Sequence, residues 1–174
     1  MELTPVQLKF VLHWGEMGAT WGINRTVAQI HALLYLAPVP MDAEEISQTL
    51  GVARSNVSTS LKELLGWGIV KRVHVFHDRR DRFETLQDPW ELFRIIVDER
   101  KKREIDPTLE MLRECHKESL ANGDKETSVR LGRMVEFFET MTGWYDQMRK
   151  LPLAMTIKFV KMGSKVPKWL GLAS

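Results

Sequence analysis

The residues with the clearest chemical character are small hydrogen-bonding side chains flanked by two cations. They lie between positions 54 and 62, and they are Arg54, Ser55, Asn56, Ser58, Thr59 and Lys62. Short hydroxyl and amide side chains allow close approach and reach the edges of bases, while Arg and Lys neutralise phosphate. A helix that lies in a DNA groove needs this composition, although a solvated helix face could also have it.

A second charged group follows in a short polar segment. Arg79, Arg80 and Arg82 alternate with Asp78 and Asp81. Three cations in a tight loop repel one another unless an anion arrives, and the two aspartates can hold them by ion pairs in the free protein. An arginine in such a loop suits the narrow minor groove, whose negative potential attracts it. Taken together, the two groups predict a DNA-binding module.

Apolar spacing predicts the elements that position these side chains. Apolar residues at i, i+4, i+7 and i+8, starting at Val57, indicate a helix over 54–65 with its polar residues facing outward. Asp42 and Glu45 form the pattern of a capping box that starts the preceding helix. Strands are expected over 69–76 and 83–86, with the arginines at the tip of the hairpin between them.

Helices are expected on both sides of this module. Thr4-Pro5 starts the first, which Gly18 is expected to end, and the second covers 24–35. A long helical region follows Pro89, with a kink or restart at Asp106-Pro107. We therefore expect a mainly α chain with a small β-hairpin wing. Residues 1–88 would form a winged helix-turn-helix domain with its N-terminal helices, and residues 89–174 a helical region for dimerisation and effector binding.

The composition narrows the function classes. The 174 residues carry a net charge of only +2, but residues 51–82 contain seven basic and three acidic residues, a local net charge of +4. Only one cysteine is present, and neither a membrane-spanning apolar run nor a basic leader is apparent. We expect a cytoplasmic protein without a membrane partner. No catalytic, metal-ligating or phosphate-cradling constellation is evident, so an enzyme, a metal and a cofactor are not expected.

Two segments resemble a known family of regulators. The wing DRRDRFETL resembles the Asp-x-Arg wing signature of the MarR superfamily, and GVARSNVSTSLKELLGWGIVKRV resembles the recognition helix and first wing strand of its GbsR branch. The Asp-Pro-Trp at 88–90 and the positions of Trp21, Gly22 and Ala28 also fit that branch. Ala53 departs from the pattern, because such helices often begin with Ser or Thr. An alanine N-cap is weaker by about 1 kcal/mol.

The resemblance implies a homodimer that binds a pseudopalindromic double-stranded DNA operator, and we expect this protein to act as a repressor. It maps the recognition residues to the polar set between Arg54 and Lys62, and the wing contact to Arg80 braced by Asp78. The GbsR branch is associated with genes for uptake and synthesis of glycine betaine and related osmoprotectants. A winged-helix adaptor that binds protein rather than DNA is the alternative from another class.

Two further patterns concern the dimer and its effector. Apolar residues spaced 3, 4, 3, 4 and 3 apart over 131–148 form a coiled-coil-like seam, which could join two chains or pack within one. An aromatic pocket could bind a quaternary ammonium effector by cation–π attraction, although the same residues could be core and interface residues. The candidate lining residues are Trp14, Trp21, Trp90, Trp144 and Tyr145.

Overall fold

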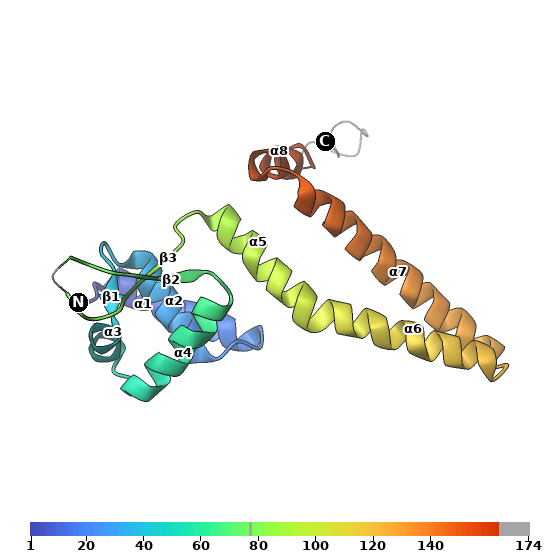
Figure 1. Ribbon diagram of the computed structural model, residues 1–174, viewed down its shortest axis with the longest axis horizontal. Coiled ribbons are helices and arrows are strands. Elements are labelled where there is room, and N and C mark those ends of the chain that lie inside the picture. Colours follow the sequence, from blue (N-terminus) through green and yellow to red (C-terminus); the bar gives the residue numbers. More distant parts are fainter. Residues whose placement is uncertain (77, 164–174) are drawn as a thin grey trace. The chain divides into compact units, whose positions relative to one another are not determined.

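The computed structural model describes residues 1–76 and 78–163, and their contacts divide the chain into two compact units, Met1–Ile96 and Val97–Ser174 (Figure 1). Among its described residues, the first unit holds four helices, a three-stranded sheet and the start of a fifth helix. Its elements in order are α1 (Pro5–Thr20), α2 (Arg25–Leu36), β1 (Met41–Asp42), α3 (Ala43–Leu50), α4 (Arg54–Gly66), β2 (Val70–Val73), β3 (Arg82–Thr85) and α5 (Pro89–Arg100).

Helix α1 begins as expected but ends later. Thr4 and Gln7 form a capping box at its start, which confirms the predicted N-cap. The prediction that Gly18 ends the helix is wrong, because α1 continues to Thr20. A Cβ placed on Gly18 would lie 2.5 Å from the Ala28 Cβ of α2. Gly18 therefore allows close approach of two helices instead of breaking one.

The helix-turn-helix follows the local sequence signals. The Asp42 carboxylate accepts hydrogen bonds from the backbone N–H of Glu44 and Glu45, and the Glu45 carboxylate accepts one from the Asp42 N–H. The predicted capping box of α3 is thus confirmed. Gly51 ends α3 in the left-handed region, with φ at 65°. Ala53 gives α4 no side-chain cap.

The sheet has one strand more than the sequence suggested. Its order is β1-β3-β2 and all pairs are antiparallel. The first hairpin strand is shorter than predicted and covers only Val70–Val73. The short β1 joins the segment before α3 to the hairpin, because Met41 pairs with Phe83 and Asp42 with Arg82. The hairpin is therefore attached directly to the start of the helix-turn-helix.

The core of the first unit lies between α2, α3, α4 and the sheet. Its largest fully buried side chains include Ile30, Leu33, Leu34, Ile46, Val57, Leu64 and Ile69. Residues from both helices of the helix-turn-helix and from the first hairpin strand thus share one core. Their packing fixes the outward face of α4.

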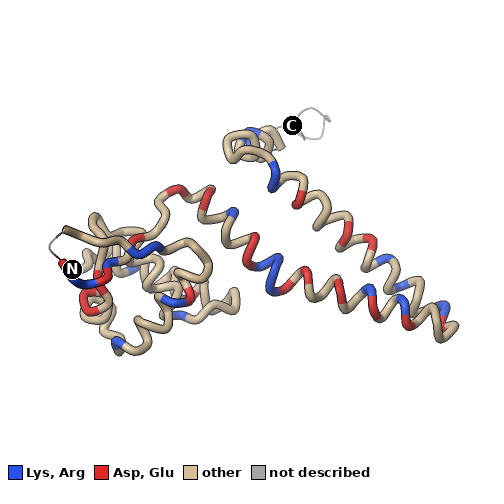
Figure 2. Tube along the Cα trace, in the orientation of Figure 1, with Lys and Arg blue, Asp and Glu red and all other residues tan. Residues whose placement is uncertain are grey.

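The second unit is mainly a helical hairpin. A π-helical segment at Lys101–Ile105 follows α5 and leads into α6 (Asp106–Ala121), close to the predicted irregularity at Asp106-Pro107. The hairpin is completed by α7 (Lys125–Lys150), and α8 (Leu153–Gly163) follows. Positive and negative residues are interspersed along α6 and α7 (Figure 2). The sequence over 153–174 predicts a short helix followed by a loose end, and residues 164–174, where that end would fall, lie outside the described residues.

The predicted seam of α7 is split between two surfaces. Leu131, Phe138 and Tyr145 are half-buried on the hairpin, whereas Met134 and Met141 are exposed. No helix in the described ranges is both long and apolar enough to cross a membrane.

A buried histidine lies in α2. His31 is 5% exposed, its ring centroid lies 6.3 Å from that of Trp14, and its Nε2 has no hydrogen-bond partner among the described residues. Burial lowers the pKa of His31 from 6.5 to about 4, because desolvation disfavours the charged ring. Between pH 6.5 and about pH 4, His31 binds a proton more readily in the unfolded chain than in the folded chain. The stability that His31 contributes at neutral pH is therefore lost as the pH falls from about 6.5 to 4.

We predict that His31 accounts for a loss of about 2 kcal/mol in the free energy of unfolding between pH 7 and pH 5. His31→Leu should remove that part of the acid sensitivity and leave stability at pH 7 nearly unchanged, since it deletes an unpaired buried nitrogen. Urea unfolding at both pH values measures this. The exposed His13 of α1 is the control, and His13→Gln should behave like the wild type. Equal acid sensitivity in His31→Leu and the wild type would contradict the assignment.

Candidate nucleic-acid interface

Helix α4 has two faces of opposite character. Val57, Ser60, Leu61 and Leu64 are buried in the core. The six residues predicted to contact DNA are all exposed, and they are Arg54, Ser55, Asn56, Ser58, Thr59 and Lys62. The Thr59 hydroxyl donates to the Ser55 carbonyl at 3.1 Å, so this hydroxyl is already used within the helix. The rest of the face offers short polar side chains between two cations.

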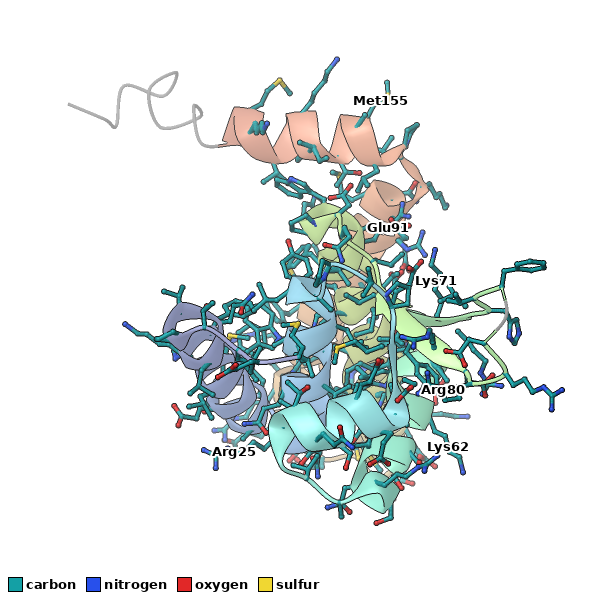
Figure 3. The ribbon with its side chains drawn as sticks, turned by 90° about the vertical axis from the view of Figure 1, so that its left-hand side faces the viewer. Arg25, Lys62, Lys71, Arg80, Glu91 and Met155 are labelled. Atoms are coloured by element: carbon teal, nitrogen blue, oxygen red, sulfur yellow. The ribbon has the colours of Figure 1, made fainter. Side chains whose placement is uncertain are left out.

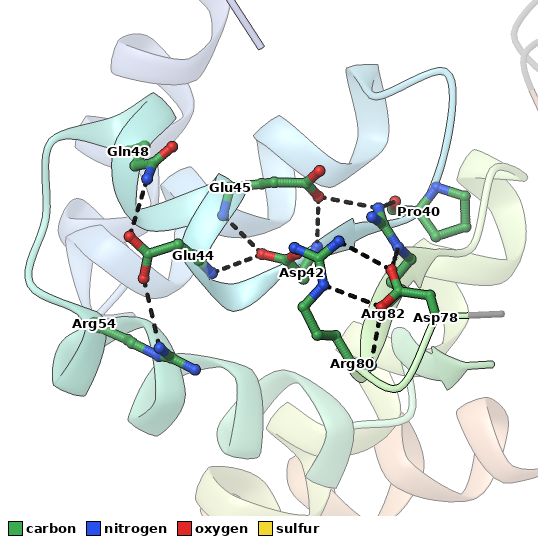
Figure 4. A network of polar contacts seen from close by, with 9 residues as sticks. All are labelled: Pro40, Asp42, Glu44, Glu45, Gln48, Arg54, Asp78, Arg80 and Arg82. Atoms are coloured by element: carbon green, nitrogen blue, oxygen red, sulfur yellow. Dashed lines mark hydrogen bonds and ion pairs between the residues drawn. The ribbon is translucent and has the colours of Figure 1, made fainter. Parts of the chain in front are cut away.

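The wing is anchored by one buried carboxylate. The Asp42 side chain is 4% exposed, and its Oδ2 lies 2.5 Å from Nη1 of Arg80, while its Oδ1 caps α3 (Figure 4). Arg80 also donates from Nε and Nη2 to the Asp78 carboxylate, at 3.0 and 3.1 Å. The Arg80 guanidinium is thus held by two carboxylates, yet its side chain is 59% exposed.

Arg82 has a different environment from the other two wing arginines. It lies in β3, and its side chain is 15% exposed. Its Nη1 donates to the Pro40 carbonyl at 2.8 Å and to Glu45 at 3.0 Å, and its Nε donates to Asp78 at 2.9 Å. The guanidinium therefore joins the wing to the segment before α3. Because these contacts occupy it and, unlike Arg80, its side chain is mostly buried, we leave Arg82 out of the proposed DNA interface.

Asp78 connects the two arginines. Hydrogen bonds from Arg80, and a further one from Arg82, hold the pKa of Asp78 well below its usual range. The carboxylate consequently remains ionised and keeps both guanidinium groups in place. Asp81, expected to brace the wing tip, instead pairs with Arg72 of β2 at 3.2 Å. Arg79 is exposed and has no ion pair among the described residues.

A cleft of about 530 Å³ lies between α3, α4 and the wing hairpin. Arg54, Ser58 and Lys62 line it from α4, and Arg72 and Arg80 line it from the hairpin. The side chains of Lys62 and Arg80 lie on the same side of the first unit, opposite Arg25 (Figure 3). The structure thus brings the cations of the recognition helix and the wing to one surface.

Arg72 and Asp42 were not predicted from the sequence as parts of this surface. Alternation along the hairpin could have indicated Arg72, because it pairs with the inward-facing Phe83 while its neighbour Lys71 faces the other way. The link from Asp42 to Arg80 joins positions 38 residues apart, and no local pattern indicates it.

The five aromatic residues of the predicted pocket belong to two units. Trp14, Trp21 and Trp90 are in Met1–Ile96, and Trp144 and Tyr145 are in Val97–Ser174. The Trp14 ring lies 5.3 Å from that of Phe10. The Tyr145 hydroxyl donates to Asp98 at 2.6 Å. Neither unit therefore contains the whole set, and the effector pocket stays a prediction.

Comparison with known proteins agrees with this geometry. Residues 21–81 match the MarR family. This region contains α2, β1, the helix-turn-helix, β2 and the loop up to Asp81, so the similarity to that family covers most of the winged helix.

Individual relatives extend the similarity beyond the winged helix. YvaV of Bacillus subtilis (strain 168), provisionally described as an HTH-type transcriptional regulator, is 22% identical over 138 residues, or 79% of this chain and 78% of its own. The HTH-type transcriptional repressor OpcR of the same organism is 26% identical over 74 residues, 42% of this chain and 40% of its own. A crystal structure of a transcriptional regulator, 23% identical, aligns with a TM-score of 0.50 over 82% of this chain and 99% of that one.

We predict that Arg82 and Arg79 have separable roles. Arg82→Gln removes the link between Asp78, Glu45 and the Pro40 carbonyl, and should lower the midpoint of thermal unfolding. Arg79→Gln removes the same charge from a side chain without an ion pair and should leave the midpoint unchanged. Circular dichroism melts of both variants test this. Equal midpoints in the two variants would refute the structural role of Arg82.

Proposed function

We propose that this chain is a dimeric, DNA-binding transcriptional regulator of the MarR type that acts as a repressor. The observation that carries the proposal is the exposed polar face of α4 beside a cleft lined by four cations, Arg54, Lys62, Arg72 and Arg80. A helix with short polar side chains can enter a major groove, and cations at its edge can contact phosphates. The names of YvaV and OpcR support regulation of transcription, and that of OpcR supports repression.

The proposed contacts divide by chemistry. Ser55, Asn56 and Ser58 would contact base edges. Arg54 and Lys62 lie at the two ends of that stripe and would contact backbone phosphates. On the wing, Arg79 and Arg80 are the cations available to the minor groove. An adaptor that binds protein remains the second candidate, but cations beside the exposed polar face of α4 favour an anionic partner.

Lys62→Gln is expected to weaken binding to all DNA sequences about equally. It should also reduce the slope of log affinity against log salt by about one. Fluorescence anisotropy with labelled DNA from upstream of the coding sequence, and with an unrelated duplex, measures both quantities over several salt concentrations. The matched control is Lys9→Gln, which removes an exposed lysine of α1. If the wild type fails to bind DNA even at low salt, the DNA-binding function is excluded and the protein-binding adaptor is favoured.

The proposed homodimer rests on an apolar stripe of α7. Met134, Phe137, Met141 and Trp144 are 47%, 61%, 49% and 53% exposed and are spaced 3, 4 and 3 apart. Such spacing places all four on one side of the helix, as in a helix–helix seam. A contiguous exposed apolar surface of this kind marks an interaction site. Two copies would present two α4 helices to half-sites about one DNA turn apart.

Phe137→Glu should raise the dimer dissociation constant more than about tenfold, because it would bury an unpaired charge in the seam. Gln147→Glu adds the same charge elsewhere on α7 and should leave the dimer intact. Sedimentation equilibrium of the three proteins tests this, with circular dichroism to verify folding. A wild type that is monomeric at micromolar concentration would exclude the dimer.

Membership of the GbsR branch and control of osmoprotectant genes are the finer parts of the proposal. They rest on the wing and recognition-helix motifs together with the aromatic residues. Tryptophan fluorescence titrated with choline and glycine betaine, followed by DNA binding with each compound, addresses the effector directly.

A further inference from the structure

The cleft between α4 and the wing contains its own anions. Three carboxylates, those of Asp42, Glu44 and Asp81, line it together with the four cations. Glu44 lies 3.5 Å from Nη1 of Arg54, and Asp81 lies 3.2 Å from Nη1 of Arg72. With the Asp42–Arg80 pair, each arginine of the cleft is bound by a carboxylate of the same cleft. Lys62 has no ion pair among the described residues.

The three ion pairs differ in how easily they can open. Asp42 is 4% exposed, caps α3 and cannot leave Arg80 without losing the cap. Glu44 and Asp81 are 48% and 44% exposed, and their arginines are more exposed still. Solvent-exposed ion pairs of this kind contribute little, so another anion can replace the carboxylate at small cost. Glu44 would also keep its hydrogen bond from Gln48, which is 3.0 Å long.

The shape of the cleft suits a phosphodiester backbone. Leu61, Leu65 and Phe83 supply an apolar lining between the cations of α4 and those of the hairpin. Arg72 reaches this side of the hairpin because it pairs with Phe83, whereas Lys71 and Glu84 pair on the opposite face. A DNA strand that runs from a groove occupied by α4 to one occupied by the wing must cross the space between them.

We propose that this cleft is the path of the DNA backbone and that Glu44 and Asp81 limit DNA affinity by occupying its arginines in the free protein. On binding, a phosphodiester group takes the place of Glu44 at Arg54 and of Asp81 at Arg72, while Asp42 stays on Arg80. This inference rests on the proposed DNA binding. The two carboxylates would therefore weaken DNA binding, and the removal of either one should tighten it.

Glu44→Gln and Asp81→Asn should each bind duplex DNA about three- to fivefold more tightly at 150 mM salt, because a nearby negative charge no longer opposes the phosphate. The matched control is Glu84→Gln, which removes the same charge from an ion pair on the other face of the same hairpin. Its effect should stay below about twofold, because screening weakens the more distant interaction. Fluorescence anisotropy with upstream DNA measures all three, and thermal melts verify folding.

A double-variant cycle tests the exchange at a single arginine. If Asp81 acts by occupying Arg72, Asp81→Asn should give no gain in a chain that already carries Arg72→Gln. A gain of equal size in both backgrounds would indicate general repulsion and overturn the exchange. Variants that bind no more tightly than Glu84→Gln would also overturn it while leaving DNA binding intact. Failure of every protein, wild type included, to bind DNA at low salt would overturn this inference and the proposed function together.

Discussion

The arrangement of the helix-turn-helix and the wing depends on one buried carboxylate. Asp42 ends the short β1, caps α3 with one oxygen and binds the Arg80 guanidinium with the other. The helix-turn-helix and the wing are consequently oriented by the same side chain. A buried carboxylate without its partner would be costly, so Arg80 cannot move freely away from it. The base of the wing is therefore held in a fixed position relative to the helix-turn-helix.

The carboxylates at the base of the wing reduce its positive charge. Arg80 and Arg82 share three carboxylates, those of Asp42, Glu45 and Asp78, so the base of the wing has a net charge of −1. The positive potential expected of three adjacent arginines is largely cancelled there. The cations with weak or no partners lie around the cleft and at the tip, on Arg54, Lys62, Arg72 and Arg79. The surface most suited to phosphate is thus the cleft between α4 and the wing.

Much of this module could be predicted from the sequence because its signals are local. Capping boxes, the 3.6-residue apolar period and the glycine after α3 specify the helix-turn-helix and the outward face of α4. Contacts between distant segments could not be predicted in this way. Gly18 has the residue type of a helix terminator, but its role is set by Ala28 on another helix. Arg82 has the residue type of a DNA contact, but its environment is set by Pro40 and Glu45.

We propose α4 and the wing as the surface that contacts DNA. Amide hydrogen exchange of the protein with and without duplex DNA from its upstream region tests this most directly. Exchange should become slower in peptides that cover 54–62 and 78–82, with peptides of α1 unchanged. Slower exchange confined to α1 or to residues 97–163, with α4 unaffected, would contradict it.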